Sequence, residues 1–149
     1  MTQNKITPFI WFNAEGGHMQ PIVTYYQNIF GAAFNAGAIT TLSNAPGSQT
    51  QTCEVTLFGQ KYGLLCTAAL HQPLTDAISF MLHCEDQNEI DSYWNYFTRE
   101  GKESRCGWCI DKYGLRWQVL PKNFKELLQK PNAFNVMMGQ TKIVMAEYL

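Results

Sequence analysis

Glu54 is the first side chain whose type and position could support chemistry. It alternates with Thr52 and Thr56 along one face of a strand-like segment, and the opposite face is apolar. If the polar face lines a cavity, Glu54 could orient a ligand or take a proton as a general base. If that face is wet, Glu54 is an ordinary surface charge. The alternation shows which residues share a face but leaves both interpretations open.

His83 is the second candidate, since histidine is the side chain whose ordinary pKa lies nearest to neutrality. It alternates with Ser79 and Met81 along another strand-like segment. A general base needs a group that orients its ring, and the sequence assigns His83 no carboxylate for this purpose. A histidine hydrogen-bonded to backbone or solvent is therefore the favoured interpretation. His18 and His71, at a helix start and in a linker, are interpreted as solvated.

Cys106-Gly107-Trp108-Cys109 has the spacing of a redox dithiol or of half a zinc site. A redox pair of this type needs a helix N-terminus directly after its first cysteine, whereas the residues that follow here indicate a strand end and a turn. A structural zinc site needs a second pair at compatible spacing, and the five scattered cysteines do not supply one. We interpret Cys106 and Cys109 as unpaired thiols packed at a sheet edge.

Composition restricts the partners of this chain. Eleven basic and 12 acidic residues leave a net charge of -1 without any long run of like charge, so we expect neither nucleic acid nor a membrane surface as a partner. No apolar stretch approaches the roughly 20 residues that span a bilayer, and the polar start of the sequence lacks the apolar core of a signal peptide. With 46% hydrophobic residues, the sequence predicts one globular domain, 1–149, in the cytoplasm.

The candidate side chains must be positioned by elements that occur in the same order twice. In the first copy we expect a strand, a helix and three strands, over 6–12, 18–30, 32–42, 52–58 and 62–67, with a loop over 44–48. In the second copy we expect a strand, a helix behind a capping box and two strands, over 77–84, 86–100, 104–110 and 115–120. Lys-Tyr-Gly-Leu occurs in both copies, at 61–64 and 112–115, as the expected turn into each last strand. The sequence thus predicts two βαβββ modules, about 5–70 and 76–121, and a helical tail over 122–149.

This order resembles the vicinal oxygen chelate superfamily of glyoxalases, bleomycin-resistance proteins and extradiol dioxygenases. Four runs are similar to its PhnB-like branch: Pro8–Phe12, Ala77–Phe80, Cys106–Trp108 and Asp111–Val119. The resemblance implies a glyoxalase-like α+β fold whose curled mixed sheets surround a cavity, commonly in a homodimer. Members of this branch often carry the name 3-demethylubiquinone-9 3-methyltransferase. The sequence does not support that activity, because no strand is followed by the glycine-rich turn of a nucleotide-type cofactor site.

The resemblance also implies where metal-dependent relatives hold their metal, which is on the first and last strand of each module. When the two copies are aligned on their repeat, the four ligand positions fall on Pro8, Thr67, Ser79 and Gln118. Only Gln118 offers a plausible ligand oxygen, whereas a catalytic metal needs about three good protein ligands. Some PhnB-like relatives carry a histidine on the third strand, where the nearest residue here is Thr52. We therefore expect no metal and no cofactor.

The leading hypothesis is that an unknown small organic molecule binds in the cavity between the modules, without turnover. The expected contacts of this ligand are Glu54, Gln118, Ser79 and Thr52. The alternative is an enzyme of the lyase or isomerase type, with a non-standard metal or with acid–base chemistry by Glu54 and His83. A third hypothesis is a dimeric protein whose cavity is filled by its own aromatic side chains.

Overall fold

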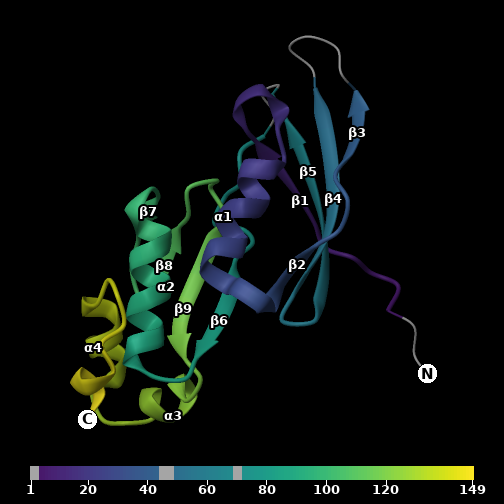
Figure 1. Ribbon diagram of the computed structural model, residues 1–149. Coiled ribbons are helices and arrows are strands. Elements are labelled where there is room, and N and C mark those ends of the chain that lie inside the picture. The colour runs from purple at the N-terminus through teal and green to yellow at the C-terminus, as the bar shows by residue number, and fades with distance from the viewer. Residues whose placement is uncertain (1–3, 44–48, 69–71) are drawn as a thin grey trace. The chain divides into compact units, whose positions relative to one another are not determined.

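The computed structural model describes residues 4–43, 49–68 and 72–149, which fall into two compact units, Met1–Pro73 and Leu74–Leu149. Each unit is described by itself. Each contains a strand, then a helix, then further strands that complete one sheet (Figure 1). The predicted βαβββ order is therefore present twice, and the fold is α+β. The loop predicted over 44–48 and the linker residue His71 lie outside the described residues.

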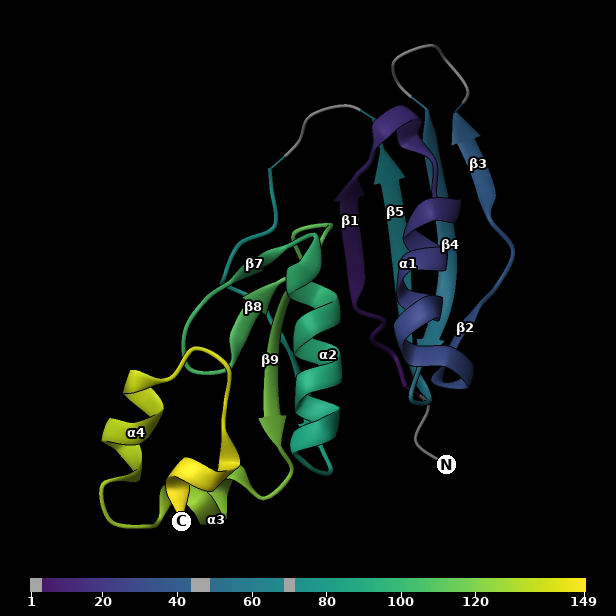
Figure 2. The same ribbon diagram turned by 60° about the vertical axis from the view of Figure 1, so that its left-hand side comes forward.

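The first unit is a mixed sheet with one helix on it. Its strands are β1 (Phe9–Asn13), β2 (Phe34–Ala36), β3 (Thr40–Ser43), β4 (Thr50–Leu57) and β5 (Gln60–Thr67), its helix is α1 (Gln20–Phe30), and 3-10 turns η1 (Glu15–Gly17) and η2 (Gly31–Ala33) flank that helix. The strand order is β1-β5-β4-β2, and β3 also pairs with β4. β1 is parallel to β5, and the other pairs are antiparallel. Figure 2 shows α1 lying along one face of this sheet.

The core of the first unit lies under α1. The helix begins with Pro21 in its first turn and ends where Gly31 adopts a φ of 55°, as the sequence predicts. Its buried apolar residues are Ile22, Val23, Tyr25, Tyr26 and Phe30. The Tyr26 ring contacts those of Phe12 and Phe34, with centroids 6.1 and 6.2 Å away. Aromatic packing therefore joins the helix to strands at both sides of the sheet.

The predicted strand over 32–42 is two short strands, β2 and β3. Gly37 lies at the break, where its N–H donates to the Glu54 carbonyl at 2.8 Å. A Cβ at Gly37 would lie 3.2 Å from that same oxygen, so the close approach favours glycine. The register of β3 against β4 then shifts between Thr41 and Ser43.

The first Lys-Tyr-Gly-Leu copy lies within β5 and not at the turn before it. The turn consists of Phe58 and Gly59, whose φ values are 49° and 79°, one residue before the tight turn that the sequence predicts at Gly59-Gln60. Two residues with positive φ match the twist of a tight hairpin, so Gln60 already pairs with Leu57.

The second unit repeats this plan with a smaller sheet. Its strands are β6 (Phe80–Cys84), β7 (Lys102–Glu103), β8 (Trp108–Ile110) and β9 (Arg116–Pro121), and its long helix is α2 (Gln87–Arg99). The order is β6-β9-β8-β7, with β6 parallel to β9. The Asp86 carboxylate accepts a hydrogen bond from the Glu89 N–H at 2.9 Å, which confirms the predicted helix cap. Phe97 stacks on Trp117 at a centroid distance of 4.7 Å and joins α2 to the sheet.

The second Lys-Tyr-Gly-Leu copy does form a turn, between β8 and β9, and Asp111 holds it. The Asp111 carboxylate accepts from the backbone N–H groups of Tyr113 and Leu115 and from Nε1 of Trp117, at 2.8, 3.1 and 2.8 Å. Asp111 is only 2% exposed, so this buried charge is stabilised by N–H donors.

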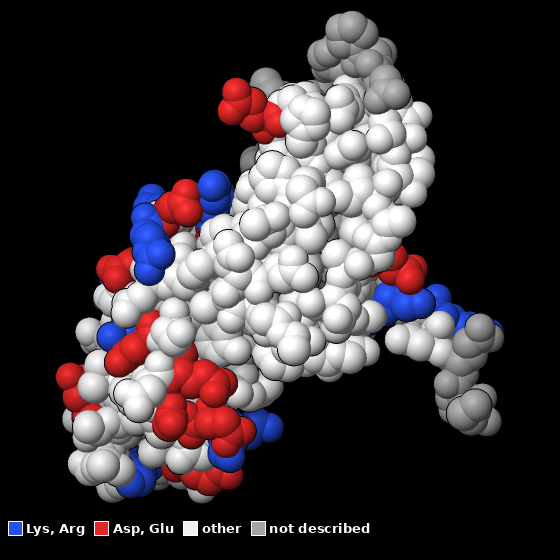
Figure 3. Space-filling view, in the orientation of Figure 1, with Lys and Arg blue, Asp and Glu red and all other residues white. Residues whose placement is uncertain are grey.

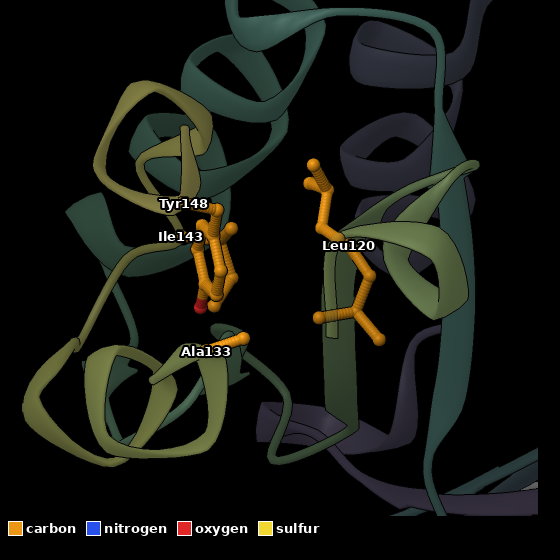
Figure 4. Packing of buried hydrophobic residues seen from close by; sticks show 5 residues of the cluster. Leu120, Ala133, Ile143 and Tyr148 are labelled. Carbon is orange, nitrogen blue, oxygen red and sulfur yellow. The ribbon is translucent and has the colours of Figure 1, made fainter. Parts of the chain in front are cut away.

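The tail is helical only in part. It contains α3 (Phe124–Leu128), α4 (Ala133–Gly139) and a 3-10 turn η3 (Met145–Tyr148), and residues 140–144 between them are not helical. Their path is fixed by the Gln87 side chain, which donates to the Ile143 carbonyl and accepts from the Met145 N–H. Figure 4 shows Ile143 and Tyr148 side by side in a cluster with Leu120, Leu127 and Ala133. None of the helices in the described part of the chain is long and apolar enough to cross a bilayer.

Candidate ligand-binding face of the first sheet

The face of the first sheet opposite α1 carries the candidate residues of the first unit. Register places Phe9, Gly63 and Glu54 in one row across β1, β5 and β4. Trp11 and Thr52 belong to the next row of the same face, with Leu65 between them. Phe9 is 61% exposed and Trp11 is 44% exposed, so two large aromatic rings lie at the surface of this unit.

Phe9 lies directly on Gly63. A Cβ at Gly63 would be 2.2 Å from Cε2 of the Phe9 ring, a distance that no side chain tolerates. The absence of a side chain at Gly63 therefore provides the space that the ring occupies. Phe9 is a residue of this face that the sequence prediction missed. The signal that could have identified it is Gly63, a glycine in the interior of a predicted strand.

A depression of about 450 Å³ opens on this face. Its lining residues are Thr7, Phe9, Ala38, Thr40, Thr52, Cys53, Glu54 and Gly63. The structure thus brings Glu54 and Thr52, two of the predicted contacts, to one hollow surface. Hydroxyl groups surround the carboxylate, and Phe9 supplies the apolar wall, a combination that is typical of small-molecule sites.

Glu54 forms an exposed ion pair at this depression. Its Oε1 lies 3.3 Å from Nζ of Lys61, and the two side chains are 65% and 53% exposed. An ion pair this exposed contributes at most about 1 kcal/mol to stability. The Lys61 ammonium therefore balances part of the carboxylate charge, although Lys61 is not among the described residues that line the depression.

Thr52 and Cys53 have their hydrogens engaged by the backbone. The Thr52 hydroxyl donates to the Leu64 carbonyl at 2.9 Å, which leaves its oxygen lone pairs as acceptors. The Cys53 thiol donates to the Gly37 carbonyl, and burial raises its pKa above the ordinary value. Cys53 is therefore a protonated packing residue with no nucleophilic character.

Pro8 and Thr67 are the two positions of the first unit at which metal-dependent relatives hold their metal, and neither offers a suitable side chain here. Pro8 precedes β1 and shares the parity of Ile10 and Phe12, which are buried on the α1 side. Thr67 is 6% exposed, and its hydroxyl oxygen accepts from Nε1 of Trp11 at 2.9 Å. The neighbouring residue Phe9, and not Pro8, occupies the face on which the candidate ligand contacts lie.

Ser79 and Gln118 meet in the second unit. Nε2 of Gln118 donates to Oγ of Ser79 at 2.9 Å, and both side chains are half-buried. Gln118 pairs with Met81 on one side and Trp108 on the other, on the face opposite α2. The sequence predicts both residues as ligand contacts, and that contact stays a prediction.

These positions do not fit a divalent metal ion. Pro8 has no donor atom, and the oxygens of Thr67 and Ser79 already accept N–H groups from neighbouring side chains. Neutral hydroxyls are weak ligands for such an ion. Within residues 4–43, 49–68 and 72–149, no three His, Cys, Asp or Glu side chains gather as a metal-binding group.

The two histidines in the described part of the chain, His18 and His83, differ in what surrounds them. His83 is exposed on β6, and the described residues give its ring no orienting carboxylate. Nδ1 of His18 lies 3.3 Å from Nε2 of Gln49, and this histidine is exposed as expected. The structure therefore provides no catalytic pairing for His83 within its own unit.

Cys106 and Cys109 are unpaired thiols, as predicted. Cys109 is fully buried in β8, where burial raises the pKa of its thiol to about 12. β8 lies between β9 and β7, so the predicted place at a sheet edge is wrong for Cys109. Cys106 is half-buried in the preceding turn, with Sγ 4.0 Å from Sδ of Met138.

Gly16 and Gly17, which precede α1, do not form a cofactor-binding turn. A Cβ at Gly17 would lie 2.5 Å from the Gln49 carbonyl oxygen, so this glycine is required by packing against the protein's own backbone. The mixed strand orders of both sheets also differ from the parallel order of doubly wound cofactor-binding folds.

Known proteins of similar structure support this fold. A PhnB protein from Bacillus cereus, described as a 3-demethylubiquinone-9 3-methyltransferase, is 28% identical over 78% of this chain and 99% of its own, with a TM-score of 0.62. A protein from Pseudomonas aeruginosa is 12% identical over 78% of this chain and 98% of its own, with a TM-score of 0.56. The fosfomycin resistance protein FosX from Listeria monocytogenes is 14% identical over 87% of this chain and 100% of its own, with a TM-score of 0.55.

The last two proteins are too distant in sequence to indicate more than a shared glyoxalase-like fold. A search of curated proteins found no match. The model of one protein family matches residues 4–120, which is most of the chain and ends just before the tail. By that match, the chain belongs to the 3-demethylubiquinone-9 3-methyltransferase family, the PhnB family of glyoxalase-like proteins.

Proposed function

We propose that this protein binds a small organic molecule in the depression of the first sheet, and that it does so without a metal ion. The observation that carries the proposal is that Glu54, Thr52 and Phe9 line one hollow of about 450 Å³. This volume lies within the usual range for ligand pockets, roughly 300–1,000 Å³. The carboxylate and hydroxyl groups would fix the orientation of the ligand, and the ring would bury its apolar part.

Ser79 and Gln118 are proposed as further ligand contacts. Their hydrogen bond holds both side chains in a defined orientation on the second sheet. A preorganised amide and hydroxyl pair can exchange this mutual bond for bonds to a polar ligand at little entropic cost. A homodimer is also proposed, on the basis of the family resemblance, and light scattering of the purified protein tests it.

The alternative function, a lyase or isomerase that uses Glu54 and His83 as acid and base, has no specific observation in its favour. The two residues belong to different units, and neither has an orienting partner of the kind that general bases use. Turnover of a bound ligand, followed by mass spectrometry, would establish this alternative.

A thermal-shift screen of small organic molecules, followed by calorimetric titration of the hits, tests the proposal. A ligand that binds only the folded protein raises its melting temperature in a concentration-dependent way. We expect the hits to lose affinity in Phe9→Ala and to keep it in Phe58→Ala, because Phe58 is also 61% exposed but lies in the hairpin turn. Equal affinities of the two variants would contradict the proposed site.

A further inference from the structure

The charges around the depression point to the chemical class of its ligand. We propose that the ligand is an organic cation, a molecule with an ammonium or guanidinium group, whose charge lies between the Glu54 carboxylate and the Phe9 ring. This inference rests on the proposed function and deepens it.

The first observation is the sign of the charge. Of the described residues that line the depression, only Glu54 is charged. Residues 1–73 contain just four charged side chains, which are Lys5, Glu15, Glu54 and Lys61. Figure 3 shows the same division, with most of the visible charge over the second unit and a largely uncharged surface on the first. Within the described lining, the Glu54 carboxylate is therefore the charge that a ligand meets, and it favours a cation that can compete with the Lys61 ammonium 3.3 Å away.

The second observation is that Thr52 and Glu54 present acceptor atoms. The Thr52 hydroxyl hydrogen is engaged by the Leu64 carbonyl, so its oxygen acts as an acceptor, as does the Glu54 carboxylate. A ligand that brings N–H donors can bond both groups.

The third observation is the position of the Phe9 ring. The ring lies on Gly63, and the side chain as a whole is 61% exposed. The face of an aromatic ring attracts cations, and a carboxylate beside the ring adds its own attraction. Glu54 stands in the same row of the sheet, directly across Gly63 from Phe9.

The ion pair with Lys61 does not prevent such binding. Both partners are more than half exposed, so the ligand exchanges one weak, hydrated contact for a charge-assisted bond in a hollow. The exchange also gives a directional prediction, because removal of the Lys61 charge should strengthen the binding of a cation.

Nuclear magnetic resonance titration with three probes of similar size tests the inference. The probes are the benzylammonium cation (protonated benzylamine), the neutral benzyl alcohol and the anionic benzylphosphonate. We expect benzylammonium to bind about tenfold more tightly than benzyl alcohol, and benzylphosphonate not to bind. The largest shifts should fall on the resonances of Phe9, Glu54 and Gly63.

Variants separate the contributions. Glu54→Gln should reduce the affinity for the cation to that for benzyl alcohol, and Lys61→Gln should strengthen cation binding severalfold. Glu85→Gln is the matched control, because Glu85 forms an equally exposed ion pair with Lys122 in the second unit. Phe9→Ala should weaken both benzyl probes.

The outcomes distinguish the inference from the proposed function. If the cation and the alcohol bind the wild type equally and both are lost in Phe9→Ala, the ligand site stands and the cation class is wrong. If none of the three probes shifts the resonances of this face, both the site and the ligand class are contradicted. If the phosphonate binds best, the inference is overturned.

Discussion

The Asp111 carboxylate illustrates, at the scale of single residues, how a run that is characteristic of the family can be structural. Asp111–Val119 is among the runs that carry the resemblance, yet its acidic residue is 2% exposed and accepts from N–H groups of its own turn. Its second oxygen accepts from Nε1 of Trp117. The residue therefore fixes the turn and the buried indole and has no access to a ligand.

Replacement of Asp111 by Asn should destabilise the protein by about 2–3 kcal/mol, because the new NH₂ group would face N–H donors in a buried place. Urea unfolding followed by circular dichroism measures the loss. Asp76→Asn is the control, since that carboxylate is 76% exposed although it bonds Nε of Arg116. A loss equal to that of the control would show that the turn does not depend on Asp111.

Four of the five thiols should resist alkylation in the folded protein. Cys53, Cys66, Cys84 and Cys109 are buried, and burial raises their pKa values, to about 11 for Cys66 and about 12 for Cys84 and Cys109. Cys106 is half-buried in its turn and is the thiol that iodoacetamide can reach. Mass spectrometry after labelling at about pH 8.5 should find one modified cysteine per chain. Two or more rapidly modified cysteines would contradict the packing described.

The same thiols make stability depend on alkaline pH. The folded protein keeps their protons above the ordinary thiol pKa of 9.0, where the unfolded chain releases them. A raised pKa in the folded state gives stability that is present below pH 9.0 and is lost as pH rises toward about 12. We expect the free energy of unfolding to fall over this window, and Cys109→Ala should show a shallower fall.

At the scale of elements, the close pairing of β1 and β5 through Gly63 gives a sharper test of the ligand site. Gly63→Ala would place a Cβ 2.2 Å from Cε2 of Phe9, so the ring must leave its position. Affinity for benzylammonium should fall about as much as in Phe9→Ala, by a factor of several. Gly139→Ala, where a Cβ meets nothing within 4 Å, should keep the affinity of the wild type. Unchanged binding by Gly63→Ala would mean that the position of the ring does not matter.

The tail is a second element whose role can be measured. Ile143 is fully buried at 0% exposure, in a cluster with Leu120 and Tyr148 (Figure 4). Ile143→Ala should destabilise the protein by about 3 kcal/mol, because the cavity it leaves is enclosed. Phe134→Ala on α4, where the ring is 64% exposed, should change stability little. Similar losses in the two variants would show that the tail does not pack as described.

The sequence predicts which helices and strands are present more completely than it predicts where each one begins and ends. Periodicity and caps predict α1 and α2 because helical spacing, Gly31 and Asp86 are local signals. The division of the second strand into β2 and β3 depends on Gly37 meeting the Glu54 carbonyl, a contact between distant residues that no local pattern contains. The first Lys-Tyr-Gly-Leu copy misled the prediction, because identical residues form a strand in one copy and a turn in the other.

At the scale of the whole molecule, the repeat and the family runs predict the fold, and the family match confirms it over residues 4–120. The site is less predictable. Alternation placed Glu54 and Thr52 on one face, and the structure then showed that this face is hollow. The importance of Phe9 depends on its register opposite Gly63, which sequence spacing alone does not fix. The uneven distribution of charge between the two units, by contrast, is visible in the sequence.

The central claim is that the depression beside Glu54 is the ligand-binding site of this protein. Mapping of backbone amide shifts in the wild type, during titration with a hit from the small-molecule screen, tests it most directly. We predict that the largest shifts cluster on Thr52, Glu54 and Gly63, which line the depression on two adjacent strands. A saturable titration whose largest shifts lie elsewhere, with these three amides unmoved, would contradict the claim.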